Sequence, residues 1–191
     1  AIAQVRLRTK TKDDELGTEI SIDGSEVQDQ QAVATEIGCS LAVKNLFYNI
    51  PARRNFLKSD AVELRHIIDE FQRVVLVHFD LGFSFYNNDN LLFQLEPTNM
   101  RQRIVQVFGK NTNEKLVPVD ETTDVVQLKG FVYKPEFSKK SRQQQFFFVN
   151  NRFVKSPYMH HAILSAFEGL LAPNMQPGYI VYINVPPQTI D

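Results

Sequence analysis

The residues best suited to chemistry in this sequence are the cations that gather between residues 134 and 155. They are Lys134, Lys139, Lys140, Arg142, Arg152 and Lys155, and Glu136 is the single acidic residue among them. Contacts to a phosphate backbone need positioned cations and no particular base code. Arg142, Arg152 and Lys155, with Lys139 and Lys140 behind them, are therefore candidate nucleic-acid contacts. A solvated basic loop is the alternative that fits the same residues.

Other kinds of site lack residues that they require. A P-loop needs a glycine five residues before Gly109, where this chain has Ile104. His160 and His161 would be helix neighbours that point about 100° apart, so they do not jointly chelate one ion. Cys39 has no nearby His and Asp that would make it a nucleophile. From the residues alone, we assign no catalytic residue and no metal ligand.

The composition is that of a folded, soluble protein. The chain has 191 residues, of which 43% are hydrophobic and 23% charged, and its formal net charge is -1. This near-neutral balance excludes nucleic-acid binding by bulk charge, so such binding needs a local patch. No apolar run approaches the roughly 20 residues of a membrane span, and the single cysteine favours a reducing compartment. We therefore expect a cytoplasmic location.

The first half of the sequence predicts an antiparallel sheet followed by a helix. Residues 5–12, 19–22 and 41–44 alternate as half-buried strands do, and Asp23–Gly24 suits a tight hairpin turn. Pro51 bends the chain and can start a short helix. From Asp60, with Glu63 completing a capping box, apolar residues at helical spacing predict a helix packed on a sheet. These residues are Leu64, Ile67, Ile68, Phe71 and Val75.

The second half follows a break at residues 96–99, which we take as a domain boundary. Thr98 or Asn99 can cap the next helix, which ends at Gly109. Strands follow at about 115–119, 125–133, 145–149, 152–154 and 179–185, and Ser156–Pro157 starts another helix. We therefore predict an α+β protein of two domains, residues 1–95 and 96–191, each a sheet with helices on one side.

Two stretches resemble MutL-type DNA mismatch repair proteins. Residues 38–58, GCSLAVKNLFYNIPARRNFLK, resemble the family pattern of Gly-Thr, a strand, and then Leu-Phe-Tyr-Asn-x-Pro-Ala-Arg-Arg-x-Phe-Leu. The residues that carry this match are Leu46, Phe47, Tyr48, Asn49, Pro51, Ala52, Arg53 and Arg54. Residues 147–154, FFVNNRFV, look like the Val-Asn-Gly-Arg hairpin of the family. The resemblance covers essentially the whole chain in the right order.

This resemblance implies a fragment of a GHKL ATPase. Residues up to about 95 would be the later part of the ATPase domain, and the rest a transducer domain of ribosomal-protein-like fold. In the family, ATP closes the N-terminal halves into a homodimer, and a basic groove along the transducers binds DNA. The dimer then couples a MutS-type mismatch-recognition protein to a downstream nuclease and helicase. The resemblance thus implies DNA mismatch repair, with DNA and these proteins as partners and ATP and Mg as cofactors of the full-length protein.

The sequence departs from the family where the nucleotide binds. The family's catalytic Glu, its magnesium-binding Asn and its Asp-x-Gly-x-Gly site would precede Ala1, and its phosphate-contacting Lys would follow Asp191. Cys39 stands where the family usually has Thr near the adenine, and a thiol is the weaker hydrogen-bond partner. Gly38 and Cys39 are therefore the only nucleotide-adjacent residues that we assign. We expect no cofactor on this chain alone, and neither tight ATP binding nor ATP hydrolysis.

The first signature favours a structural role over a functional one, because it is dense in Leu, Phe and Tyr. We expect a guanidinium of Arg53 or Arg54 to brace the short helix by donating to backbone carbonyls, and Asn49 to do the same at the bend. Two functions outside DNA repair stay open. One is an RNA-binding module, because the transducer fold also occurs in the ribosome, and the other is a self-association scaffold with no nucleic-acid role.

Overall fold

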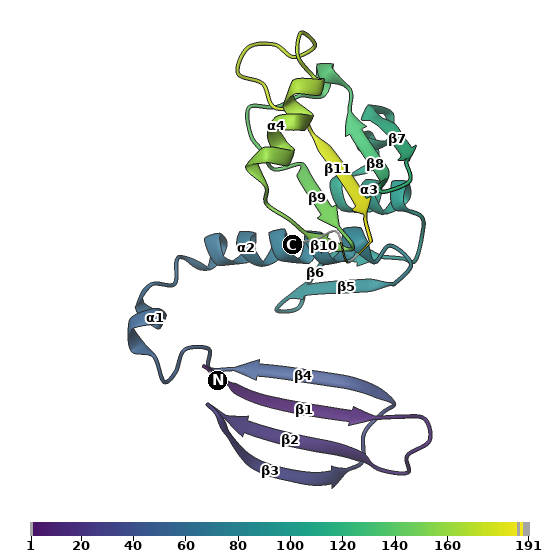
Figure 1. Cartoon of the computed structure of the whole chain (residues 1–191). Coiled ribbons are helices and arrows are strands. Elements are labelled where there is room, and N and C mark those ends of the chain that lie inside the picture. The colour runs from purple at the N-terminus through teal and green to yellow at the C-terminus, as the bar shows by residue number, and fades with distance from the viewer. Residues whose placement is uncertain (1, 187, 189–191) are drawn as a thin grey trace. The chain divides into compact units, whose positions relative to one another are not determined.

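The computed structural model describes residues 2–186 and residue 188, and it divides into two compact units, Ala1–Arg65 and His66–Asp191 (Figure 1). Helix α2 (Asp60–Val77) contributes residues to both units. The predicted α+β class is confirmed. The boundary that we expect between residues 95 and 96 separates the ATPase and transducer domains that the family resemblance implies, and it stays a prediction. Within the described residues, no helix is long and apolar enough to cross a membrane.

The first unit contains a four-stranded antiparallel sheet in the order β3–β2–β1–β4 and the short helix α1 (Pro51–Asn55). The strands are β1 (Gln4–Lys10), β2 (Gly17–Asp23), β3 (Glu26–Val33) and β4 (Gly38–Lys44). Gly24, in the predicted turn between β2 and β3, has a φ of +61°, which glycine adopts without steric cost. The expected start of a helix at Pro51 is also confirmed.

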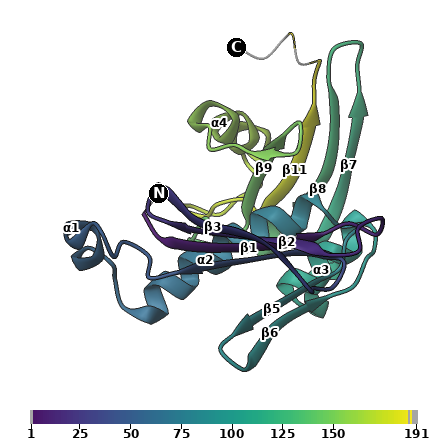
Figure 2. The same cartoon turned by 90° about the horizontal axis from the view of Figure 1, so that it is seen from below.

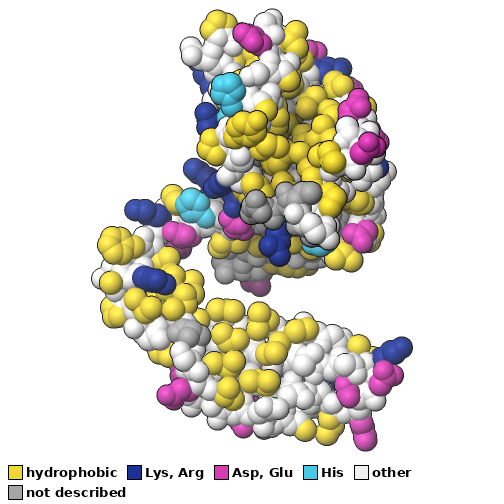
Figure 3. Space-filling view, viewed as in Figure 1, with side chains coloured by type: hydrophobic (Ala, Val, Ile, Leu, Met, Phe, Trp, Pro, Cys, Tyr) yellow, Lys and Arg dark blue, Asp and Glu magenta, His cyan; other side chains and the backbone are white. Residues whose placement is uncertain are grey.

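The two faces of this sheet differ in chemistry because side chains alternate along each strand. In the strand register Leu7 lies between Ile20 and Leu41, and Val5 lies between Ile22 and Val43, which gives an apolar face. Leu41 is 63% exposed and Val43 is 55% exposed. Figure 3 shows hydrophobic side chains gathered over this sheet. On the other face, the predicted basic side of β1 is partly neutralised, because Arg6 and Arg8 both form ion pairs with Glu19.

The second unit is built around a five-stranded sheet in the order β10–β9–β11–β8–β7, in which only the β9–β11 pair is parallel. Its strands are β7 (Leu116–Thr122), β8 (Gln127–Tyr133), β9 (Gln145–Val149), β10 (Arg152–Phe153) and β11 (Tyr179–Asn184). The remaining elements are the hairpin of β5 (Phe83–Asn87) and β6 (Asn90–Leu95), helices α3 (Met100–Phe108) and α4 (Pro157–Ala166), and the 3-10 turns η1 (Lys110–Lys115) and η2 (Pro135–Phe137).

The five-stranded sheet has helices on both faces, where the sequence predicted helices on one. Phe146 and Phe148 of β9 join the cluster that contains Leu76 of α2 and Ile104 of α3. Phe147, between them, belongs to the cluster that packs against Met159 and Ile163 of α4. Figure 2 shows α4 and α3 on opposite sides of these strands. A strand that is apolar on both faces needs cover on both sides, and β9 and β11 are such strands.

Local signals place the helix ends in this unit as predicted. Asn99 caps α3 by accepting a hydrogen bond from the backbone N of Gln102, and Ser156 caps α4 in the same way with Met159. Asn150 and Asn151, between β9 and β10, have φ angles of +46° and +65°, as expected for a tight hairpin. The apolar stripe predicted along α2 is wrong at Ile67, which is 53% exposed.

Candidate nucleic-acid interface

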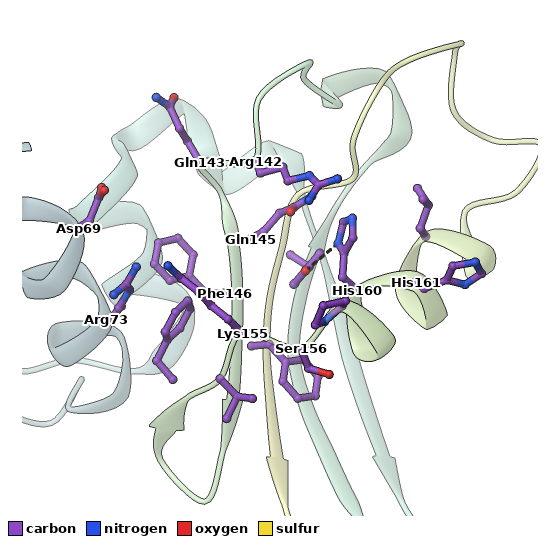
Figure 4. Close-up of a pocket in the computed structure, with 16 residues that line it drawn as sticks. Asp69, Arg73, Arg142, Gln143, Gln145, Phe146, Lys155, Ser156, His160 and His161 are labelled. Atoms are coloured by element: carbon purple, nitrogen blue, oxygen red, sulfur yellow. Dashed lines mark hydrogen bonds between the residues drawn. The ribbon is translucent and has the colours of Figure 1, made fainter. Parts of the chain in front are cut away.

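A cavity of about 700 Å³ lies in the second unit, where β9 begins (Figure 4). Helix α2, the segment that enters β9, the segment from β10 into α4, α4 itself and the start of β11 all contribute to its wall. Its ionisable lining residues are Asp69, Arg73, Arg142, Lys155, His160, His161 and Tyr179. The rest of the wall is polar amide or apolar, with Phe146, Phe147 and Phe153 among its members.

Arg142 enters the cavity from a loop that is fixed on either side. Before it, the backbone N and O of Lys139 pair with the O and N of Gln176 at 3.2 and 2.7 Å. After it, the backbone O of Gln144 accepts from the N of Tyr179 at 2.8 Å, and the Gln145 Nε2 donates to the O of Pro177 at 2.9 Å. These bonds hold the loop against the segment that leads into β11, so Arg142 is positioned by backbone contacts although its side chain is exposed.

Lys155 reaches the cavity from the link between β10 and α4. The backbone N of Val154 donates to the O of Phe147 at 2.8 Å, which extends the pairing of β10 with β9 by one residue. Ser156 follows as the cap of α4, with its Oγ 3.3 Å from the Met159 N. Lys155 is therefore held between a strand and a capped helix. It lies beside the helix N-terminus, where the backbone dipole favours negative charge.

Arg73 forms the wall on the α2 side. Its guanidinium carbon lies 4.2 Å from the centre of the Phe153 ring, and it forms an ion pair with Glu70. A cation over an aromatic face is attracted by the ring quadrupole, so this contact ties α2 to β10. Arg73 thus adds positive charge to the cavity from a helix that lies far before the basic segment in the sequence.

His160 and Tyr179 form a hydrogen-bonded pair inside the cavity. The Nδ1 of His160 lies 3.1 Å from the Oη of Tyr179. Burial lowers the pKa of His160, and the positive charge of Arg142 lowers it further. Burial raises the pKa of Tyr179, and Arg142 opposes that rise. The charge of Arg142 therefore acts on both rings, and on each it opposes a positive charge or favours a negative one.

The structure brings together two of the five cations predicted as nucleic-acid contacts. Arg142 and Lys155 line the same cavity. Arg152, on the exposed side of β10, is paired with Val149 and is outside this lining, as are Lys139 and Lys140. Whether any of the five contacts nucleic acid stays a prediction.

Sequence reasoning missed Arg73 and Asp69 on α2. No local signal links these two residues to a loop so far along the chain. The contact of Arg73 with Phe153 arises only from the packing of α2 against β10. His160 is half-buried and His161 exposed, as expected for residues of a surface helix. Within the described part of the chain, no group of three or more His, Cys, Asp or Glu residues is placed to hold a metal ion.

Gly38 and Cys39, which the resemblance predicts to lie near a nucleotide, and the first signature belong to the first unit. Gly38 and Cys39 open β4 opposite Lys10 and Thr9, and both are exposed. In the signature, the backbone N of Phe47 donates to the O of Ile2 at 2.7 Å, and the Tyr48 hydroxyl donates to Asp23. These contacts fit a structural role for this part of the motif.

The bracing expected from Arg53 and Arg54 is not seen. Both side chains are exposed on α1, and among the residues that the structure describes neither guanidinium makes a hydrogen bond. The five residues of α1 include no buried side chain, so the helix offers no buried carbonyl that an arginine would have to satisfy.

Comparisons with known proteins agree over the whole chain. The family described as "DNA mismatch repair protein, C-terminal domain" matches residues 104–191. The DNA mismatch repair protein MutL of Christiangramia forsetii is 61% identical over all 191 residues, and that of Flavobacterium psychrophilum is 59% identical. In both cases the chain spans only 31% of the length of the relative.

Solved structures share the fold at lower identity. The MutL ATPase domain of Aquifex aeolicus complexed with ADP has a TM-score of 0.75 and 19% identity, with 97% of this chain and 69% of that chain covered. The N-terminal domain of a DNA repair protein has a TM-score of 0.83 and 21% identity, with 100% and 62% covered. The DNA gyrase B-subunit of Myxococcus xanthus has a TM-score of 0.57 and 13% identity, with 99% and 58% covered.

Proposed function

Because the chain belongs to the MutL-type family of DNA mismatch repair proteins, we propose that it supplies DNA-binding surface to an ATP-dependent mismatch repair matchmaker. The longer protein would bind DNA through its phosphates without sequence preference and close into a dimer with ATP and Mg. It would pass the signal from a MutS-type recognition protein to a nuclease and a helicase, in the cytoplasm. In this proposal the 191-residue chain contributes phosphate contacts and no catalytic residue.

One observation carries the DNA-binding part of the proposal. Arg142 and Lys155 come from separate segments, line one cavity, and belong to no ion pair among the described residues. Cations without acidic partners are available to phosphates, and neutralising phosphates releases counterions from DNA. Arg152 is exposed on the neighbouring strand β10, and we propose it as a further backbone contact, with Lys139 and Lys140 on the loop before Arg142.

Gly38 and Cys39, the residues that we propose beside the nucleotide, are exposed at the start of β4. Gly38 has a φ of +128° and open space where a Cβ would stand, so a ligand can approach its backbone. We propose these two residues as part of a nucleotide site that other residues of the longer protein complete.

The test of DNA binding is the salt dependence of duplex affinity for the chain and for Arg152→Glu. Losing one phosphate contact should weaken binding on every sequence and lower the slope of log affinity against log salt by about one. Lys110→Glu is the matched control, because Lys110 is exposed on η1 and lies outside the cavity lining. An unchanged slope and affinity for Arg152→Glu would remove Arg152 from the interface. Tighter binding to structured RNA than to duplex DNA would favour an RNA-binding module instead.

A further inference from the structure

The cavity has the dimensions of a small-molecule site. Its volume of about 700 Å³ falls within the roughly 300–1,000 Å³ of pockets that enclose a drug-sized ligand. A duplex that lies along a basic surface needs no such hollow, because its phosphates are contacted from outside. Phe146, Phe153 and Leu164 give part of the wall an apolar character, which a phosphate alone would not require.

Three cations reach the wall of the cavity from three separate elements. Arg73 comes from α2, Arg142 from the loop before β9, and Lys155 from the link between β10 and α4. Asp69 is the one carboxylate among the lining residues, so the wall carries a net charge of +2 with both histidines neutral. A phosphodiester within a strand offers one negative charge, whereas a terminal phosphomonoester carries about −1.5 to −2 at pH 7. Positive charge concentrated at one place therefore matches a strand end better than a continuous backbone.

Most of this positive charge is free to act on a ligand. Arg73 is occupied by Glu70 and by the Phe153 ring, but within the described residues no carboxylate lies within 4.0 Å of Arg142 or Lys155. Figure 4 shows the side chain of Arg142 extending towards His160, and the charge of Arg142 lowers the pKa of both His160 and Tyr179.

We propose that this cavity binds a nucleotide with a terminal phosphomonoester, either at the end of a DNA strand or as a free mononucleotide. The phosphate lies between Arg142 and Lys155, next to the first turn of α4. The sugar and base pack towards Phe146 and Phe153, on the side where Arg73 closes the wall, as bases pack on aromatic side chains in other single-strand binders. The strand-end form of this proposal rests on the DNA binding proposed above, and the free-nucleotide form does not.

The experiment compares ligands that differ only in the terminal phosphate. Fluorescence anisotropy measures the affinity of the chain for a labelled single-stranded oligonucleotide with a 5′-phosphate and for the same oligonucleotide with a 5′-hydroxyl. A second arm repeats the pair with the phosphate at the 3′ end. Thymidine monophosphate and thymidine then compete with the labelled strand. We expect the phosphorylated form to bind about tenfold more tightly, because it adds charge-assisted hydrogen bonds to two cations.

Variants test whether the preference for a phosphorylated end arises in this cavity. Arg142→Gln and Lys155→Gln should each reduce the ratio between phosphorylated and hydroxyl ends to near one, and Lys110→Gln should keep it. Using both variants guards against a local effect of Arg142→Gln on the loop, because Lys155 lies on a different segment. Circular dichroism of each variant checks that the fold is kept.

The outcomes separate this inference from the proposed function. Equal affinity for phosphorylated and hydroxyl ligands overturns it, even if Arg152→Glu still lowers duplex affinity. A preference that survives both Arg142→Gln and Lys155→Gln also overturns it, since the phosphate would then bind elsewhere. Direct binding of thymidine monophosphate but not of thymidine, measured by isothermal titration calorimetry, with no measurable binding of DNA would keep the cavity as a mononucleotide site and reject the DNA-binding proposal.

Discussion

At the scale of residues, His160 in the cavity wall is a histidine whose surroundings oppose its protonation. Its ring is held by Tyr179, and both burial and Arg142 keep its pKa below the usual value. His161, its neighbour on α4, is exposed and contacts Ser165. The two histidines therefore form a matched pair: one whose protonation the fold opposes, and one that remains open to water.

This pair predicts how stability depends on pH. An unfolded histidine takes up a proton near pH 6.5, whereas His160 in the folded chain takes it up at lower pH. The unfolded state then binds more protons in this window, so the free energy of unfolding falls as the pH drops below about 6.5. Urea denaturation between pH 5 and 8 should show a weaker pH dependence for His160→Gln than for the unchanged chain, while His161→Gln should match the unchanged chain. Equal curves for His160→Gln and the unchanged chain would contradict the role of His160.

At the scale of elements, the close approach of β8 and β11 depends on one glycine. Gly130 lies in β8 opposite Val181 and has a φ of +145°. A Cβ at this position would stand 2.2 Å from the backbone O of Ile180, so no side chain fits without moving the strands apart. The central strand pairing, which supports the start of β11 and with it Tyr179, is therefore sensitive to this single position.

Gly130→Ala should destabilise the second unit by about 2–4 kcal/mol, since it adds both backbone strain and overpacking. Gly169→Ala is the control: Gly169 also has a positive φ, +75°, but nothing lies within 4 Å of the added Cβ. It should cost only the conformational part, about 1 kcal/mol. Thermal or urea unfolding measures both. A similar loss for the two variants would show that the contact with Ile180 relaxes freely.

The elements also show what the sequence could and could not predict. Helix ends at Asn99 and Ser156 were predictable because a cap is a local signal. Residues 26–33 were not assigned, since the polar edge strand β3 is exposed along most of its length and lacks an alternating pattern. The two-sided cover of β9 and β11 was missed because alternation alone does not say which helix lies on which face. Arg142 and Lys155 could be predicted as candidates because both belong to the basic segment at residues 134–155. Arg73 could not, because it reaches the cavity only through the packing of α2 against Phe153.

Arg103 illustrates the same limit at a structural position. It is fully buried on α3, and its Nη2 donates to the backbone oxygens of Phe79, Leu81 and Glu96. Burial lowers the pKa of this guanidinium, although Asp80 opposes the shift. The sequence alone gives no reason to expect Arg103 to differ from the other polar residues of a surface helix. In the structure its hydrogen bonds join the segment after α2 to the segment after β6. They thereby hold the C-terminal end of α2, where Leu76 packs in the core.

At the scale of the whole molecule, two kinds of residue are divided between the two units. The nucleotide-adjacent pair Gly38 and Cys39 belongs to the first unit, and the cations Arg142 and Lys155 belong to the second. We propose each set as part of a site, an exposed strand end for a nucleotide and a basic cavity for phosphates. The chain spans 31% of the length of its relatives, and we expect it to bind DNA without hydrolysing ATP.

The last prediction concerns that turnover. The 191-residue chain should release no phosphate from ATP above a no-protein blank, because we propose no catalytic residue on it and propose Gly38 and Cys39 as only part of a nucleotide site. A phosphate-release assay with Mg and excess ATP measures this, and the Aquifex aeolicus MutL ATPase domain, whose structure is known as a complex with ADP, serves as the comparison. Release that rises with chain concentration and disappears in Cys39→Ala would contradict the prediction and place a working nucleotide site on β4. Release that rises with chain concentration but is unaffected by Cys39→Ala would contradict the prediction as well, and would place the activity away from Cys39.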